Sequence, residues 1–109
     1  MKDNKLYLRH IRDAIEKIEK YISDVNYEQF VSNDMMADAV LRQLAVIGEA
    51  TNNLSDDFRQ SHPAVPFRDI IDMRNILIHN YTDVDIKVVW DTCKGNLPEL
   101  KRFVAEILG

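Results

Sequence analysis

Cysteine, glycine, proline and long apolar runs are all scarce in this sequence of 109 residues. Its one cysteine, Cys93, excludes an intrachain disulfide and a zinc cluster built on thiols, and it fits a reducing compartment. The longest uninterrupted apolar run is Leu44 to Ile47, whereas a membrane span needs roughly 20 such residues. The charged start, Met1 to Lys5, predicts no secretory signal. We therefore expect a soluble cytoplasmic protein with no membrane partner.

An excess of basic charge is also absent, because 14 Lys and Arg stand against 18 Asp and Glu, for a net charge of −4. Proteins that coat nucleic acids through charge usually present a basic face. Any contact with phosphates should therefore be confined to a small local site. The length predicts a single domain, residues 1–109, and surface scaling lets such a chain bury about two-thirds of its extended surface.

Apolar residues recur three or four positions apart in long segments, which is the spacing of amphipathic helices. The first helix is predicted from about residue 4 to 23, capped by Asp3 or Asn4, and the second begins after Ser32 or Asn33. The stripe of the first helix is Leu8, Ile11, Ile15, Ile18 and Ile22. The stripe of the second is Met36, Val40, Leu44, Ile47, Thr51 and Leu54. Gly48 lies inside the second helix, which predicts that another helix packs closely there.

Shorter signals place the remaining elements. Residues 27–31 form a single turn, a short element runs from Ser55 to about Pro63, and Pro66 suits the first turn of a further helix. In the last helical stretch, Thr82 with Asp85 three residues later is typical of a capping box. Gly95 and Pro98 should break or kink that stretch. The predicted fold is all-α, a four-helix up-and-down bundle with a short extra helix.

Familiar catalytic and cofactor motifs are missing. The sequence has no glycine-rich phosphate loop, no H-E-x-x-H, no paired E-x-x-H and no G-x-S-x-G. His10 shares a helix face with Asp13 but makes a poor metal site, and His62 precedes Pro63 in a turn, so both histidines are interpreted as surface or structural residues. We therefore expect no metal and no cofactor.

The helix predicted to begin at Pro66 carries the unusual residues. Arg74 falls in an apolar stripe, and a buried guanidinium is costly unless it is paired. Glu49, whose neighbours indicate burial, is a candidate partner, in which case Arg74 is purely structural. Asn75 and His79 lie four residues apart on one flank, and Tyr81 returns toward the side of Arg74. The stripe comprises Phe67, Ile70, Ile71, Leu77 and Ile78.

Arg74 and His79 point in directions about 140° apart on an ideal helix. For both side chains to act on one ligand, the helix must end near His79 or a second subunit must contribute.

The motif Arg74-x-x-x-x-His79-x-Tyr81, with Asn75 after the arginine, resembles the signature of HEPN domains. More narrowly, it resembles the HepT-like toxins that are paired with MNT-type nucleotidyltransferase antitoxins. The resemblance extends over nearly the whole chain, because further segments occur in the order that the family shows. These are Ile47-Gly48-Glu49-Ala50, His62-Pro63, Pro66, Val89-Trp90-Asp91 and Leu97-Pro98.

The resemblance implies a metal-independent endoribonuclease that works as a homodimer with its two motifs facing each other. In such a reaction the ribose 2′-hydroxyl of the RNA substrate attacks the adjacent phosphate and leaves a 2′,3′-cyclic phosphate. His79 would be the general acid and base, since imidazole exchanges protons readily near neutral pH. Arg74 would clamp the phosphate. Asn75 would orient the substrate or His79.

Tyr81 has a separate implied role, as the residue to which the partner nucleotidyltransferase attaches AMP. A bulky anion beside Arg74 and His79 would occupy the site of the substrate phosphate and silence the nuclease, as in a type VII-like toxin–antitoxin pair. Asn80 stands where the family commonly has glycine. Because asparagine tolerates a left-handed helix cap, we expect the turn to survive.

Two other functions fit the same residues. One is a non-catalytic helical partner that binds a nucleotidyltransferase or presents a substrate to it, which needs Tyr81 but no nuclease chemistry. The other is a dimeric bundle in which Arg74 is structural. An RNA cleavage assay separates the first from a nuclease, and the stability of an Arg74→Ala variant tests the second.

Overall fold

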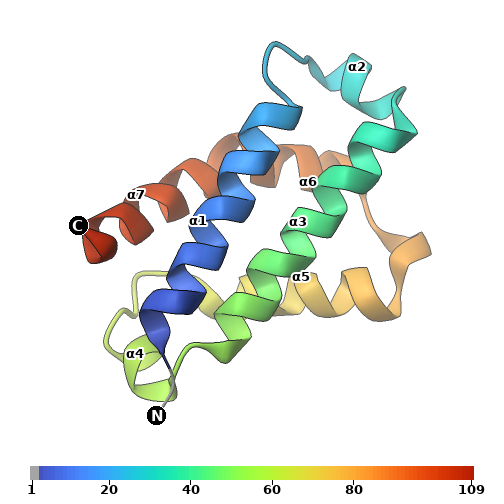
Figure 1. Ribbon diagram of the computed structural model, residues 1–109. Coiled ribbons are helices and arrows are strands. Elements are labelled where there is room, and N and C mark those ends of the chain that lie inside the picture. Colours follow the sequence, from blue (N-terminus) through green and yellow to red (C-terminus); the bar gives the residue numbers. More distant parts are fainter. Residues whose placement is uncertain (1–2) are drawn as a thin grey trace.

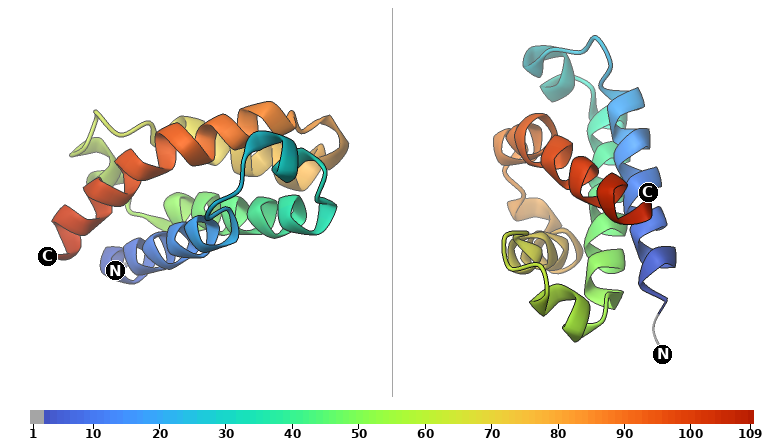
Figure 2. Two further views of the ribbon diagram at one scale, coloured as in Figure 1. Left: turned by 90° about the horizontal axis from the view of Figure 1, so that it is seen from above. Right: turned by 90° about the vertical axis from the view of Figure 1, so that its left-hand side faces the viewer.

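Helices make up most of the computed structural model, which describes residues 3–109 and contains no strand within that range. The helices are α1 (Asn4–Tyr21), α2 (Tyr27–Val31), α3 (Asp34–Asn53), α4 (Asp56–Gln60), α5 (Phe67–His79), α6 (Ile86–Asp91) and α7 (Leu97–Leu108) (Figure 1). Helices α1 and α3 lie side by side in one layer, and α5 with the α6–α7 segment forms the other (Figure 2). The predicted all-α bundle is confirmed.

Helix α1 follows the predicted pattern closely. Asp3 caps it by accepting a 3.1 Å hydrogen bond from the backbone N–H of Leu6. All five residues of the predicted stripe are buried in the core. The helix ends at Tyr21, about two residues before the predicted end, and the chain turns shortly afterwards at Asp24, whose φ is 58°.

Helix α3 packs against α1 on one side and α5 on the other. Asn33 caps it, as one of the two predicted candidates, by accepting from the N–H of Met36. A Cβ atom at Gly48 would lie 2.2 Å from the Cβ of Arg74 on α5, far inside van der Waals contact. The prediction of close packing at Gly48 is therefore confirmed, and this glycine brings the backbone of α5 against α3.

The last helical stretch is interrupted, but stays helical, where Gly95 and Pro98 predicted a break or kink. A π-helical turn, Thr92–Asn96, separates α6 from α7, and Pro98 sits in the first turn of α7, where its missing N–H costs little. The predicted capping box is wrong. Asp85 is itself the N-cap of α6, because it is extended and accepts from the N–H of Lys87, while Thr82 belongs to a 3₁₀ turn, Tyr81–Asp83.

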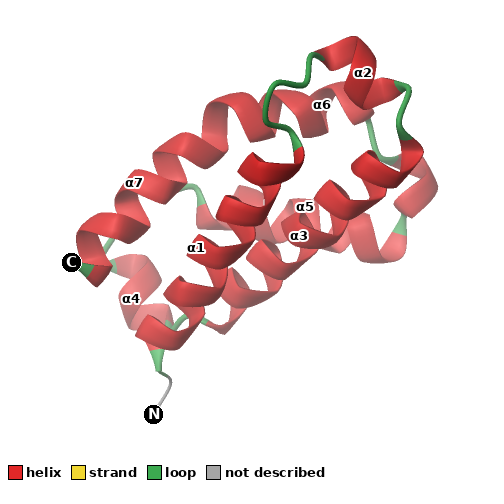
Figure 3. Cartoon of the chain, turned by 45° about the horizontal axis from the view of Figure 1, so that its top comes forward, coloured by secondary structure: helices red, strands yellow, loops and turns green. Residues whose placement is uncertain are grey.

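Loops are short, and they join the long helices at the two ends of the bundle (Figure 3). Pro66 is the N-cap of α5, one position before the first turn that the sequence predicted. None of the helices between residues 3 and 109 combines the length and apolar character of a membrane span.

Candidate functional site

Arg74 is held on the α3 side of α5 by two neighbours. Its Nη2 donates to Glu49 Oε2 at 2.5 Å, and its Nη1 donates to Asn75 Oδ1 at 2.9 Å. The Nε atom is buried and has no partner. Since a guanidinium carries five N–H donors, these two bonds leave one hydrogen on each Nη for a ligand. The side chain is 23% exposed, so its outer edge is accessible.

Glu49 is the ion-pair partner that the sequence proposed for Arg74, and the pairing is confirmed. The predicted burial of Glu49 is wrong, since its side chain is 52% exposed. Its neighbours Ile47, Gly48 and Ala50 are buried, but Glu49 points to the edge of the α3–α5 contact. A pair this exposed contributes about 1 kcal/mol or less to stability. The contact therefore gives only a weak structural reason for an arginine at this position.

Tyr81 lies in the 3₁₀ turn that follows α5, and its hydroxyl donates to Asp38 Oδ1 at 2.6 Å. The residue is 50% exposed. This hydrogen bond, a small desolvation and the charge of Asp38 together raise the pKa of Tyr81 above its ordinary value. At neutral pH the hydroxyl is therefore a neutral, accessible group whose proton points at a carboxylate.

Arg74 and Tyr81 line the same open groove of about 380 Å³ between α3 and α5. The predicted return of Tyr81 toward the side of Arg74 is thus confirmed. The other polar residues of the groove are Asp38, Arg42 and Glu49, all on α3. Its apolar walls are Leu41, Ala45, Val46, Leu77 and Ile78.

Sequence reasoning missed Asp38. The signal was present in the spacing, because Asp38 and Glu49 are 11 residues apart and 11 residues are close to three helical turns. Both carboxylates therefore lie on one face of α3, and that face meets the motif on α5. The motif itself was needed to show that this face mattered.

His79 is the last residue of α5 and is exposed to solvent. It does not line the groove that holds Arg74, and its imidazole forms no hydrogen bond or ion pair with residues 3–109. The helix therefore ends near His79, which is one of the two conditions under which both side chains could act on one ligand. Within a single chain, however, Arg74 lines the groove and His79 lies outside it. Asn75, one turn before His79, is hydrogen-bonded to Arg74 instead of His79.

Asn80 does not form the left-handed cap that the sequence predicted. Its φ is −136° and its ψ is 50°, while its N–H still donates to Ile76 O at 2.9 Å. The chain leaves α5 through this residue and enters the 3₁₀ turn directly. The turn that presents Tyr81 thus forms without a positive φ angle.

The remaining chemistry-bearing residues lie elsewhere. His62 packs its ring against Phe58 and Phe103, at centroid distances of 4.7 and 5.0 Å, as its structural interpretation requires. Cys93 is buried, and desolvation raises the pKa of its thiol to about 12. Residues 3–109 contain no group of three or more His, Cys, Asp or Glu side chains placed to hold a metal ion.

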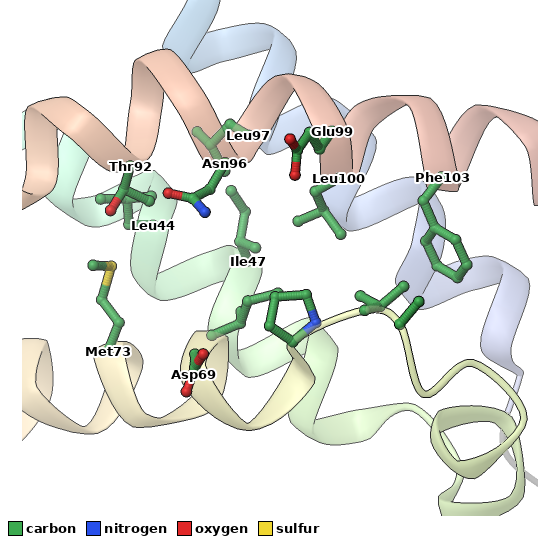
Figure 4. A pocket seen from close by; sticks show the side chains of 14 residues that line it. Leu44, Ile47, Asp69, Met73, Thr92, Asn96, Leu97, Glu99, Leu100 and Phe103 are labelled. Atoms are coloured by element: carbon green, nitrogen blue, oxygen red, sulfur yellow. The ribbon is translucent and has the colours of Figure 1, made fainter.

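A second cavity, of about 370 Å³, lies between α3, α5 and α7 (Figure 4). Leu44, Ile70 and Leu100 are among its apolar walls, and the charged residues that line it, Asp69 and Glu99, are both acidic. None of the motif residues from Arg74 to Tyr81 lines it. No cation lines this cavity, whereas the groove between α3 and α5 has two arginines beside its two carboxylates, so the groove is the better of the two for an anionic ligand.

Comparison with known proteins assigns a family. The family described as "Ribonuclease HepT-like" matches residues 11–107. A protein of Thermococcus cleftensis named "Probable ribonuclease HepT" is 41% identical over 100 residues, which cover 92% of this chain and 91% of that protein. A "Putative RNase" of Caldanaerobacter subterraneus subsp. tengcongensis is 38% identical over 108 residues, covering 99% of this chain and 96% of the relative.

One relative is much longer. A Methanocaldococcus jannaschii protein named "Gamma-glutamylcyclotransferase and putative RNase" is 38% identical over 107 residues, or 98% of this chain. The chain spans about half the length of that relative, since the match covers 48% of it. No solved structure matches the chain.

Proposed function

The chain belongs to the HepT-like ribonuclease family, and from that premise we propose that it is a metal-independent endoribonuclease that acts as a homodimer. The observation that carries the proposal is the state of Arg74. Its guanidinium is fixed in an open groove by Glu49 and Asn75, yet it keeps one free hydrogen on each Nη. A fork of this kind suits two oxygens of one phosphodiester.

The proposed reaction is attack by the ribose 2′-hydroxyl on the adjacent phosphorus. His79 accepts the hydroxyl proton as the new O2′–P bond forms and the P–O5′ bond breaks. The leaving 5′ oxygen receives a proton from an imidazolium, that of His79 or of its copy across the twofold axis. Arg74 offsets the charge that develops on the phosphate oxygens. The products are a 2′,3′-cyclic phosphate and a 5′-hydroxyl.

A second subunit supplies what one chain lacks in this mechanism. His79 lies on a different flank of α5 from Arg74, and its imidazole is exposed and has no hydrogen-bond partner in the described part of the chain. The surface beside it is apolar, with Ile76 45% and Ile78 50% exposed. Such residues favour pairing between copies of α5. In this arrangement the arginine of one protomer and the histidine of its partner meet around one phosphate.

Tyr81 is proposed as the site at which an MNT-type nucleotidyltransferase antitoxin adds AMP, in a type VII-like toxin–antitoxin pair. Its hydroxyl is accessible, and its ring lines the groove of Arg74. A phosphate on Tyr81 would face the free edge of that guanidinium and exclude RNA. Asn75 is proposed to keep Arg74 in position, since its side chain already binds the guanidinium.

The alternative is a non-catalytic helical partner of a nucleotidyltransferase. One observation favours it, namely that Tyr81 is presented to solvent by a single chain whereas the pairing of Arg74 with His79 needs two. An RNA cleavage assay separates the two functions. The nuclease cuts RNA in the presence of EDTA, leaves cyclic phosphate ends and loses activity on His79→Ala. The partner degrades no RNA in any of these samples and still accepts AMP on Tyr81.

A further inference from the structure

Helix α3 contributes more to the groove than the two carboxylates that hold the motif. Asp38 binds the hydroxyl of Tyr81, and Glu49 binds the guanidinium of Arg74. Arg42 lies between them along α3, one turn beyond Asp38, and it also lines the groove. The groove thus contains two arginines from different helices, of which only Arg74 belongs to the motif.

The two arginines differ in how their charge is balanced. Arg74 is paired with Glu49, whereas Arg42 forms no ion pair or side-chain hydrogen bond in the part of the chain that the structure describes. Asp38, one turn away from Arg42, is already occupied by the hydroxyl of Tyr81 at 2.6 Å. The exposed guanidinium of Arg42 therefore keeps its donors available to a ligand in the groove.

The surroundings strengthen the field of this charge. Ala45 and Val46, about one turn from Arg42 on α3, are among the apolar walls of the groove, and a charge beside apolar walls is less screened by water than one on an open surface. The chain as a whole has a net charge of −4. The formal charges of the groove balance, since Arg42 and Arg74 stand against two carboxylates. Those carboxylates are engaged by Tyr81 and Arg74, which leaves Arg42 as a cation without a partner among the described residues.

We propose that Arg42 is a second phosphate-binding residue, which holds the RNA phosphodiester next to the one that Arg74 clamps. The inference rests on the proposed function, in which RNA is the substrate. It adds that the α3 side of the groove binds the part of the RNA strand next to the cleaved bond. A planar guanidinium with all its donors free is suited to grip a phosphate through two parallel hydrogen bonds. Arg42 takes no part in proton transfer, and its role is to bind the substrate.

The test uses a fluorescent 2′-O-methyl RNA oligonucleotide, which lacks the attacking hydroxyl and reports binding without cleavage. Its dissociation constant is measured by anisotropy over a series of salt concentrations for the wild type, Arg42→Gln and Arg9→Gln. Arg9 is an exposed arginine on α1 outside the groove, so its variant makes the same change in net charge. A thermal melt confirms that each variant is folded.

The expected result is about tenfold weaker binding by Arg42→Gln. The slope of log K against log salt should also fall by about 0.7, the loss of one phosphate contact to a single strand. Arg9→Gln should bind like the wild type. Equal effects of the two substitutions, or a wild type that does not bind the probe, would overturn the assignment.

The same proteins separate this inference from the proposed function in an assay with cleavable RNA. If the wild type cuts RNA and Arg42→Gln has an unchanged KM, the inference fails while the nuclease stands. If binding depends on Arg42 but no RNA is cut, the nuclease fails while the inference stands.

Discussion

Glu49 on α3 and Arg74 on α5 form an ion pair across the edge of the groove, one residue beyond the contact between Gly48 and the stem of Arg74. The carboxylate both positions the guanidinium and offsets its charge. A substrate phosphate must therefore share Arg74 with Glu49 or displace it. The charge of Glu49 therefore limits how strongly the groove attracts an anion.

Replacing Glu49 by glutamine should tighten the binding of RNA. The amide oxygen still accepts a hydrogen bond from Arg74, but the competing negative charge is gone, so we expect a KM several times lower with kcat little changed. Steady-state cleavage kinetics measure both constants. Glu49→Ala is the control, because it removes the positioning contact as well and should lower kcat. A higher KM for the glutamine variant would contradict this account of the ion pair.

Gly48→Ala should destabilise the fold and disturb Arg74 at once. The new Cβ would lie 2.2 Å from the Cβ and 2.8 Å from the Cγ of Arg74, and relieving such overpacking costs about 1–3 kcal/mol. Urea denaturation measures the loss in the free energy of unfolding. Gly95→Ala is the matched control, since nothing lies within 4 Å of its added Cβ, and it should be neutral or stabilising by up to about 1 kcal/mol. Equal stability of the two variants would exclude the close approach of α5 to α3.

Tyr81 should ionise at a higher pH than a free tyrosine, because its hydrogen bond to Asp38 raises its pKa above 10.0. The contact therefore stabilises the fold fully below pH 10, and its contribution is lost as the pH rises through the pKa of Tyr81 in the folded protein. Subtracting the ultraviolet titration of Tyr81→Phe from that of the wild type isolates this ionisation. Asp38→Ala, which removes both the acceptor and the charge, should shift it toward the ordinary value. A Tyr81 that titrates identically with and without Asp38 would exclude the hydrogen bond.

The sequence predicted the elements whose causes are local. The stripe of α1 is a repeated pattern that only a helix buries, and an arginine in an apolar stripe required a partner such as Glu49. Thr82 and Asp85 were harder, because both residues are good caps and their spacing cannot show which one begins the helix. The structure selects Asp85.

The α3 side of the site could not be predicted for a different reason. Asp38 and Arg42 are ordinary polar residues on the outer face of a helix, and they matter only because α5 and its following turn pack beside them. That packing depends on Gly48. The sequence predicted that another helix packs closely at this glycine, but it did not show that the helix is α5. The place of His79 outside the groove likewise reflects how α5 is rotated against α3, which the motif alone does not specify.

Mixing two inactive variants tests most directly whether Arg74 and His79 act on one phosphate from two chains. Arg74→Ala and His79→Ala should each be inactive in RNA cleavage. After equal amounts are unfolded and refolded together, half of the dimers carry one intact pair, and the mixture should recover about a quarter of the wild-type activity. A mixture as inactive as its two components would contradict a site shared across the twofold axis.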